Sequence, residues 1–331
     1  MLGLTNRILH VQQASNPSKY DEDKQRLAGR QAEDHIENLL KELGGIPNCN
    51  IFRSLRVPDE FQTRRHEIDL IVLTNYGLYC IEVKNWAGKL ISCKNGDFWE
   101  QRKTVTKENK TFSQQTQYPN PLSESKKKTN ILRLHLLRSG VCLPESKCTS
   151  RVVLTNKSCK VDDTIKNDPT VIRYENLHIF ALSFQQSYST ILTDMVVPSF
   201  FRGTLSSTQL QQIRGSLGQI GTWDVLQLNG GKKLIGDYKG CTEISVNRKE
   251  VNQMVFSHSR NSTTGTFWAV LGYSPTTCVT MYKREQTSWF TKEIVASVTL
   301  PYNHNIGFKI AGDTTEAKIS ANDIDTIFFS T

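Results

Sequence analysis

The chain has 331 residues, enough for about two domains of roughly 150 residues each, and its 37% hydrophobic and 22% charged residues are typical of a globular protein. No apolar run approaches the roughly 18 residues that cross a bilayer, and the N-terminus lacks the apolar region of a signal peptide, so neither a membrane protein nor a secreted protein is expected. The eight cysteines form no C-x-x-C pair, which argues against a zinc site of that spacing and favours reduced thiols in an intracellular protein, cytoplasmic or nuclear.

The positive charge is concentrated in the first two thirds of the chain. Residues 1–219 hold 30 Lys and Arg against 22 Asp and Glu, whereas residues 220–331 hold 11 against 10. A basic surface attracts polyanions, so nucleic acid is the expected partner of the N-terminal part.

The predicted elements begin after a polar, mobile lead-in over residues 1–26. Apolar residues then recur with helical spacing from Ala28 to Leu43, and Gly44-Gly45 ends the helix. Turn signals at Asn75–Gly77 and a two-residue hairpin signal at Asn95-Gly96 separate runs that are typical of strands. These runs cover residues 51–57, 68–74, 78–84, 89–93 and 98–105.

The pattern changes twice more along the chain. Residues 106–122 are polar and predict a loop, and they are followed by predicted helices at 123–138, 175–195 and 205–217 and short strands at 151–155 and 170–173. This mixture predicts an α/β domain over residues 27–218. Residues 219–331 lack helical periodicity and predict an all-β module, either a barrel or a sandwich.

The all-β module contains a weak internal repeat. Ile244-Ser245-Val246-Asn247 is followed by the strand-like residues 254–257, and Ile319-Ser320-Ala321-Asn322 is followed by the similar residues 327–330. An internal duplication and a chance agreement of short β segments both explain this pattern. The module contains no catalytic cluster, so we expect it to bind a protein partner or to mediate self-association.

Four charged residues in the α/β domain form the candidate site. Glu82 and Lys84 are two positions apart on a predicted strand, so their side chains point to the same face. Asp69 lies on the preceding strand and shares that face if the hairpin loop has an even number of residues. Glu33, on the first predicted helix, adds a third carboxylate if that helix packs beside the strands.

These residue types suit hydrolysis of a phosphodiester bond. Mg²⁺ or Mn²⁺ held by two or three carboxylates activates water and stabilises the developing charge. Asp69, Glu82 and Glu33 are the expected metal ligands, and Lys84 would orient the attacking water or assist its deprotonation. The alternative is a surface ion pair between Glu82 and Lys84 on a half-exposed strand. Asp69, one hairpin away, and Glu33, on the preceding helix, favour the site. The charged residues within and after the apolar run at 78–83 also favour it, because burying unpaired charges is costly and a metal ion would offset that cost.

Several segments resemble the nuclease-related domain of the PD-(D/E)XK superfamily over about residues 27–140. They are G-R-Q-A-E at 29–33, H-E-I-D-L-I-V at 66–72, G-L-Y at 77–79 and I-E-V-K-N-W-A-G at 81–88. The resemblance implies a restriction-endonuclease-like α/β fold with Glu33, Asp69, Glu82 and Lys84 as the catalytic set.

The chain departs from the family pattern at two positions. Glu124 stands where the family's N-P-x-x-Q element usually has Gln, and Ala32 replaces a frequent Gly. Neither change removes a metal ligand, but Glu124 bears on substrate contact and local charge.

Basic residues after the motif form the expected nucleic-acid surface. Such side chains hold phosphates, although a solvated loop and helix explain them equally well. Trp86 is a candidate for stacking on a base, with packing against the sheet as the favoured alternative. The full candidate set is Arg102, Lys103, Lys107, Lys126, Lys127, Lys128 and Trp86.

The sequence therefore predicts a nuclease that depends on Mg²⁺ or Mn²⁺ and acts on nucleic acid, with DNA favoured over RNA. One alternative is a catalytically inactive nucleic-acid-binding or scaffold protein on a nuclease fold. Another is an adaptor that acts mainly through residues 219–331.

Overall fold

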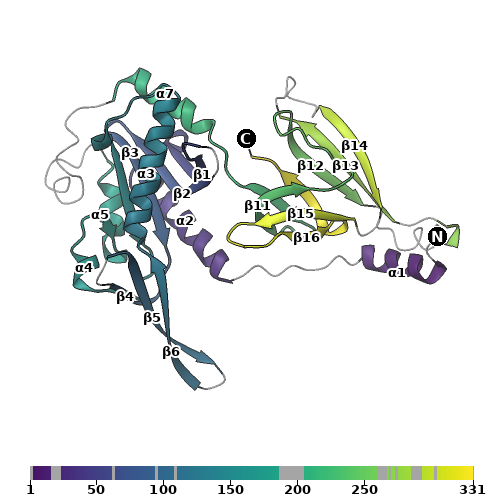
Figure 1. The fold of residues 1–331 in the computed structure, drawn as a ribbon, viewed down its shortest axis with the longest axis horizontal. Coiled ribbons are helices and arrows are strands. Elements are labelled where there is room, and N and C mark those ends of the chain that lie inside the picture. Colours follow the sequence, from purple (N-terminus) through teal and green to yellow (C-terminus); the bar gives the residue numbers. More distant parts are fainter. Residues whose placement is uncertain are drawn as a thin grey trace. The chain divides into compact units, whose positions relative to one another are not determined.

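The computed structural model describes residues 3–15, 24–61, 64–93, 96–107, 110–185, 205–258, 267, 270–272, 275–284, 293–301 and 304–330. They form two compact units, which we call the α/β unit (Asp23–Gly221) and the β unit (Thr222–Thr331 with Met1–Glu22) (Figure 1). None of the helices in these described ranges is both long and apolar enough to cross a membrane.

The α/β unit is built on a five-stranded mixed sheet with the order β1-β2-β3-β7-β9. Strands β1, β2 and β3 pair antiparallel, whereas β3, β7 and β9 pair parallel. The strands are β1 (Ile51–Pro58), β2 (Arg65–Thr74), β3 (Gly77–Lys84), β7 (Cys148–Leu154) and β9 (Val171–Ile172). The expected α/β class is confirmed, while the restriction-endonuclease-like fold remains a prediction.

Helices cover both faces of this sheet. On one face, α2 (Lys24–Glu42) and α5 (Leu177–Leu182) pack Ile36 and Phe180 against Leu70 and Ile81. On the other face, α3 (Pro121–Arg138) and α7 (Ser207–Gly218) pack against the alternate residues of β2 and β3. The central strand β3 is buried along most of its length because both faces of the sheet are covered.

A second sheet of four strands has the order β6-β5-β4-β8. Its strands are β4 (Gly88–Ser92), β5 (Phe98–Lys107), β6 (Lys110–Pro119) and β8 (Cys159–Val161). The β5–β6 hairpin extends away from the rest of the unit (Figure 1). The loop expected at residues 106–122 is therefore wrong. The sequence K-T-F-S-Q-Q-T-Q-Y-P of β6 does not alternate between apolar and polar residues, because polar residues occupy both sides of the strand. Hydrophobic periodicity therefore did not predict it.

The helical segments differ from expectation mainly at the ends of the unit. Helix α5 ends at Leu182, earlier than the helix expected at residues 175–195, and residues 183–185 form a turn. Residues 186–195 of the expected helix lie outside the described part of the chain. Helix α7 begins as expected at the Ser206/Ser207 pair, where Ser206 and Gln209 form a reciprocal capping box. Short helical segments complete the unit: α4 (Asp163–Lys166) and 3-10 turns at Asn48–Asn50, Glu145–Lys147 and Tyr174–Asn176.

The lead-in expected over residues 1–26 contains regular structure. Helix α1 (Leu4–Ser15) groups with the β unit, and α2 begins at Lys24, within the segment that was expected to be a loop. Residues 16–23 lie outside the described part of the chain.

The β unit is one antiparallel sheet of eight strands, curled into a half-barrel, with the order β14-β13-β12-β17-β10-β11-β15-β16. This confirms the all-β prediction, with a single curled sheet in place of a closed barrel or a sandwich. The strands are β10 (Asp224–Leu228), β11 (Lys233–Gly240), β12 (Val251–His258), β13 (Thr276–Lys283), β14 (Ile294–Pro301), β15 (Asn305–Ile310), β16 (Ala317–Ser320) and β17 (Ile324–Phe328), with a 3-10 turn at Ala321–Asp323.

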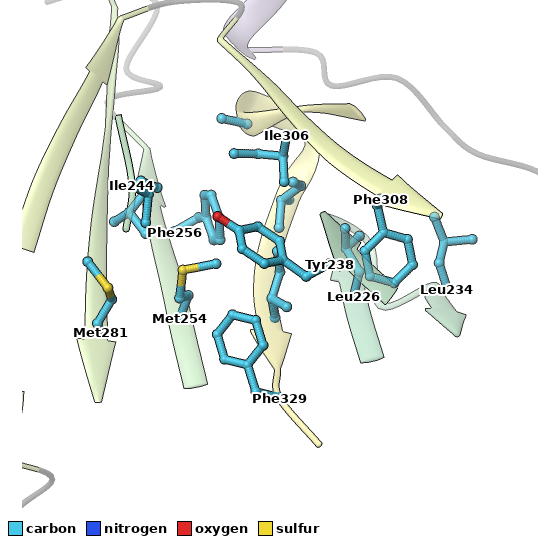
Figure 2. Packing of buried hydrophobic residues seen from close by; sticks show 14 of the residues in the cluster. Leu226, Leu234, Tyr238, Ile244, Met254, Phe256, Met281, Ile306, Phe308 and Phe329 are labelled. Atoms are coloured by element: carbon cyan, nitrogen blue, oxygen red, sulfur yellow. The ribbon is translucent and has the colours of Figure 1, made fainter. Parts of the chain in front are cut away.

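The concave side of this sheet holds a single apolar core (Figure 2). Tyr238 packs edge-on against Phe329, with ring centroids 5.3 Å apart. The buried carboxylate of Asp224 accepts hydrogen bonds from the two terminal guanidinium nitrogens of Arg248, at 3.0 and 2.7 Å. It also accepts hydrogen bonds from the backbone amides of Tyr238 and Ser330. A charge buried this deeply is tolerated because each oxygen has hydrogen-bond partners.

The two segments of the weak repeat become neighbours in the sheet. Strands β12 and β17 pair antiparallel, with Met254 opposite Ile327. Paired strands of similar sequence are consistent with a duplication, which stays a prediction.

Candidate active site

The β2–β3 hairpin brings Asp69 to Glu82. Thr74 pairs with Gly77, so the loop has two residues and meets the even-number condition. The ladder ends at the pair Leu70 and Ile81, and its register, continued by one residue on each strand, places Asp69 opposite Glu82. The Asp69 carboxylate accepts a hydrogen bond from the backbone amide of Val83 at 2.8 Å.

Glu82 is the buried centre of the site, with 6% of its surface exposed. Lys84 Nζ lies 2.7 Å from its Oε1 atom, and Lys128 Nζ lies 2.7 Å from its Oε2 atom. Lys128 comes from α3, the helix that packs on this face of the sheet. The sequence placed Lys128 in the nucleic-acid surface, whereas the structure places it against Glu82.

Glu33 approaches from α2. Its Oε2 atom lies 3.6 Å from Arg53 of β1, which also contacts Asp34 and Glu37 of the same helix. The side chain of Asn85, directly after Lys84, donates to the Ala28 carbonyl at 3.2 Å and thereby ties the end of β3 to α2. Sequence reasoning missed this contact, although Asn85 stands within the matched E-V-K-N-W segment.

The three carboxyl groups have different electrostatic surroundings. Burial, and after it the negative charge of Glu82, raises the pKa of Asp69 to about 8. Burial raises the pKa of Glu33 to about 7, although the Arg53 guanidinium limits the rise. Burial opposes ionisation of Glu82 too, but the charges of Lys84 and Lys128 outweigh it and hold its pKa below the usual value.

Lys84 is held in its charged form. Burial would lower the pKa of its ammonium group, but Glu82 and then Asp69 outweigh burial and raise the pKa above its usual value. The side chain is therefore a hydrogen-bond donor near neutral pH and has no lone pair with which to accept a proton.

The donor set suits a hard divalent cation. Three carboxylates from α2, β2 and β3 supply oxygen ligands, and burial raises the pKa of two of them, Asp69 and Glu33, to about 8 and about 7. The carboxylate oxygens of Glu33, Asp69 and Glu82 do not all lie within 4.8 Å of one another. Both oxygens of Glu82 contact lysines instead.

The other basic candidates fall into two separate groups. Arg102 and Lys103 lie on β5, and the backbone of Lys107 ends that strand while its side chain lies outside the described residues. Lys126 and Lys127 are exposed on α3 and line a cavity of about 830 Å³ between this helix and β7. Arg133 and the buried Arg151 line the same cavity, with Glu145 as its acidic residue.

Trp86 is occupied by packing, the favoured alternative. Its ring stacks on Tyr118 with centroids 4.7 Å apart and meets Trp99 edge-on at 6.4 Å. Lys84 Nζ lies 6.0 Å from the ring centroid. The indole therefore supports the strand end that holds Lys84.

Glu124 lies on the first turn of α3, one helical turn before Lys128. Its side chain is exposed, and the helix is capped by Asn120, whose side chain accepts from the Leu122 amide at 2.9 Å. Asn120 and Pro121 of the N-P-x-x-Q element thus begin α3 and set the position from which Lys128 reaches Glu82.

Comparison with known proteins identified one family model. The chain matches no curated protein and no solved structure. Residues 28–155 match the family model of the nuclease-related domain, and this stretch contains Glu33, Asp69, Glu82, Lys84 and Lys128. Through residues 28–155, the chain is therefore similar to the nuclease-related domain family.

Proposed function

We propose that the α/β unit is a nuclease that hydrolyses phosphodiester bonds of nucleic acid, with DNA favoured over RNA, and that requires Mg²⁺ or Mn²⁺. The observation that carries the proposal is the convergence of Glu33, Asp69 and Glu82 with two lysines at one end of β3. The match of residues 28–155 to the model of the nuclease-related domain supports it.

Asp69 and Glu82 would hold the cation, and Glu33 would support it directly or through water. When bound, such a cation supplies positive charge to the phosphate and lowers the pKa of a coordinated water. The raised pKa values of Asp69 and Glu33 support this assignment, because burial disfavours their charged forms and a bound cation would offset that cost.

Lys84 would orient the attacking water and donate a hydrogen bond to developing negative charge. Its raised pKa favours this role over proton abstraction. Lys128, at the other oxygen of Glu82, offers a second positive group for the phosphate.

One observation favours the rival, a catalytically inactive nucleic-acid-binding protein on this fold. Both oxygens of Glu82 are bound to ammonium groups, so cation binding at Glu82 requires its carboxylate to exchange partners. The rival retains the basic residues of β5 and α3 and predicts binding without cleavage.

Cleavage of labelled single- and double-stranded DNA and RNA separates the two. The full chain is assayed with Mg²⁺, Mn²⁺ or EDTA beside Asp69→Ala and Lys84→Ala. Metal-dependent cleavage that is lost in both variants supports the nuclease and identifies its substrate. Nucleic-acid binding without cleavage on any substrate would overturn it in favour of the rival.

A further inference from the structure

A second cluster of potential metal ligands lies in the β unit, apart from the candidate active site. The thiol of Cys241, the carboxylate of Glu243 and the imidazole of His304 place ligand atoms within 4.8 Å of one another. Among the residues that the structure describes, no other three His, Cys, Asp or Glu side chains meet this condition. His304 Nε2 lies 2.5 Å from Glu243 Oε2.

Buried anchors fix both segments that supply these side chains. Cys241 follows β11 and is bridged to Ile244, and His304 directly precedes β15, which pairs with β11. Ile244 and Ile306 are both buried in the apolar core (Figure 2). The ligands are thus held by the folded sheet.

Two of the ligands, Cys241 and His304, line a small open pocket. It has a volume of about 380 Å³, and Glu316 and Lys318 also line it. A side chain at Gly307 would clash with the Glu316 carboxylate, so the glycine lets this second carboxylate lie close to the backbone of β15. The positive charge of Lys318 would oppose a bound cation. Lys318 is exposed, however, and its flexible side chain can place the ammonium group in solvent.

Tyr238 supplies an independent observation. Its buried hydroxyl lies beside the Cys241 thiol, which is its hydrogen-bond partner, although the geometry of this contact is poor. A metal-bound thiolate is a stronger acceptor than a neutral thiol, and hydroxyl groups commonly donate to metal ligands. Coordination at Cys241 would therefore strengthen the contact between this hydroxyl and the sulfur.

We propose that Cys241, Glu243 and His304 form a binding site for Zn²⁺. A sulfur, a nitrogen and an oxygen ligand together favour zinc over Mg²⁺, which prefers oxygen alone. Three protein ligands leave a fourth position for water or for Glu316. An ion pair between His304 and Glu243 accounts for only two of the three residues and gives no role to the thiol or to Tyr238.

Cobalt substitution tests this proposal on the full chain. Co²⁺ bound by a thiolate gives a ligand-to-metal charge-transfer absorption, which the all-oxygen candidate site of the α/β unit does not produce. We expect this band in the native protein, its loss in Cys241→Ser, and its displacement by Zn²⁺. Cys278→Ser, a cysteine elsewhere in the same sheet, is the matched control and should keep the band.

Affinity measurements complete the test. Zn²⁺ titration should show weaker binding in Glu243→Gln and His304→Ala, by more than the roughly 10–100-fold that is lost when a hydrogen-bond partner of a metal ligand is removed. Glu243 is exposed, so Glu243→Gln keeps the experiment informative if a core-facing variant fails to fold. Absence of the band, or a band unchanged in Cys241→Ser, would overturn the proposal, and neither result depends on nuclease activity.

Discussion

Lys128 Nζ lies 2.7 Å from Glu82 Oε2 and so joins α3 to β3 across 46 positions of the sequence. Lys84 binds the other oxygen of the same carboxylate. Glu82 is consequently held as an anion, whereas Asp69, with its pKa near 8, keeps its proton at neutral pH. Two neighbouring acids therefore differ in charge before any cation arrives.

Replacement of Lys128 by Met should reduce cleavage by roughly 10²-fold, because one positive hydrogen-bond donor is removed from the reacting phosphate. Single-turnover cleavage at saturating metal measures the loss. Lys166→Met is the control, since Lys166 is exposed on α4 and lies outside the candidate nucleic-acid surface. Equal rates in both variants would remove Lys128 from the site.

Arg53→Met should shift metal binding to higher pH. The guanidinium limits the rise in the pKa of Glu33, so its removal raises that pKa further above 7 and leaves the carboxyl protonated at neutral pH. Metal affinity measured from pH 6 to 9 should show the shift, and Arg53→Lys should restore part of it. An unchanged profile would mean that Glu33 does not take part in metal binding.

Metal binding should release protons below about pH 8, because Asp69 and Glu33 must ionise to become ligands. Both folded-state pKa values lie above the usual ones, so without metal these groups stabilise the fold most at low pH and lose that contribution as pH rises through about 7 to 8. Calorimetry in buffers of different ionisation enthalpy measures the release. Asp69→Asn should diminish it, and zero release in the native protein would contradict the assignment.

The affinity for nucleic acid should fall as the salt concentration rises, and Lys126 and Lys127 of α3 should account for part of this dependence. Lys126→Ala with Lys127→Ala removes two positive charges, so the slope of log K against log salt should fall by about two if each contacts a phosphate. Fluorescence anisotropy over a salt series provides the slope. Lys249→Ala, an exposed lysine of the β unit, should leave it unchanged.

Asp224→Ala should destabilise the β unit by at least about 3 kcal/mol, because Arg248 and two backbone amides lose their acceptor. Thermal unfolding followed by circular dichroism measures the effect. Asp237→Ala, on the half-exposed neighbouring strand, should cost far less, and similar losses in the two variants would contradict the account of Asp224.

The site was predictable where local spacing decides geometry. The i, i+2 rule placed Glu82 and Lys84 on one face, and the turn at residues 75–76 set the register that brings Asp69 beside them. Lys128 escaped prediction because three consecutive lysines give no indication of which one faces the sheet. Only the packing angle of α3 decides that.

Elements with balanced or polar patterns were also beyond sequence reasoning. Strand β6 has no continuous apolar face, and hydrophobic periodicity therefore could not reveal it. It is a strand because it pairs with β5 along an extended hairpin. The cluster of Cys241 and His304 depends on the pairing of β11 with β15, which lie far apart in the sequence. Spacing of the cysteines alone argued against a zinc site, because such spacing detects only ligands that are close in sequence.

The distance along the chain between Glu82 and Lys128 also governs the order in which the site is completed during synthesis. The β2–β3 hairpin emerges first and presents Asp69 and Glu82, but Lys128 follows only with the middle of α3. A slip of one residue between β2 and β3 would turn Asp69 to the opposite face and away from the Val83 amide. An unfinished or wrongly paired chain thus lacks the assembled cluster, and the protein acquires its chemistry only once the sheet and α3 are in place.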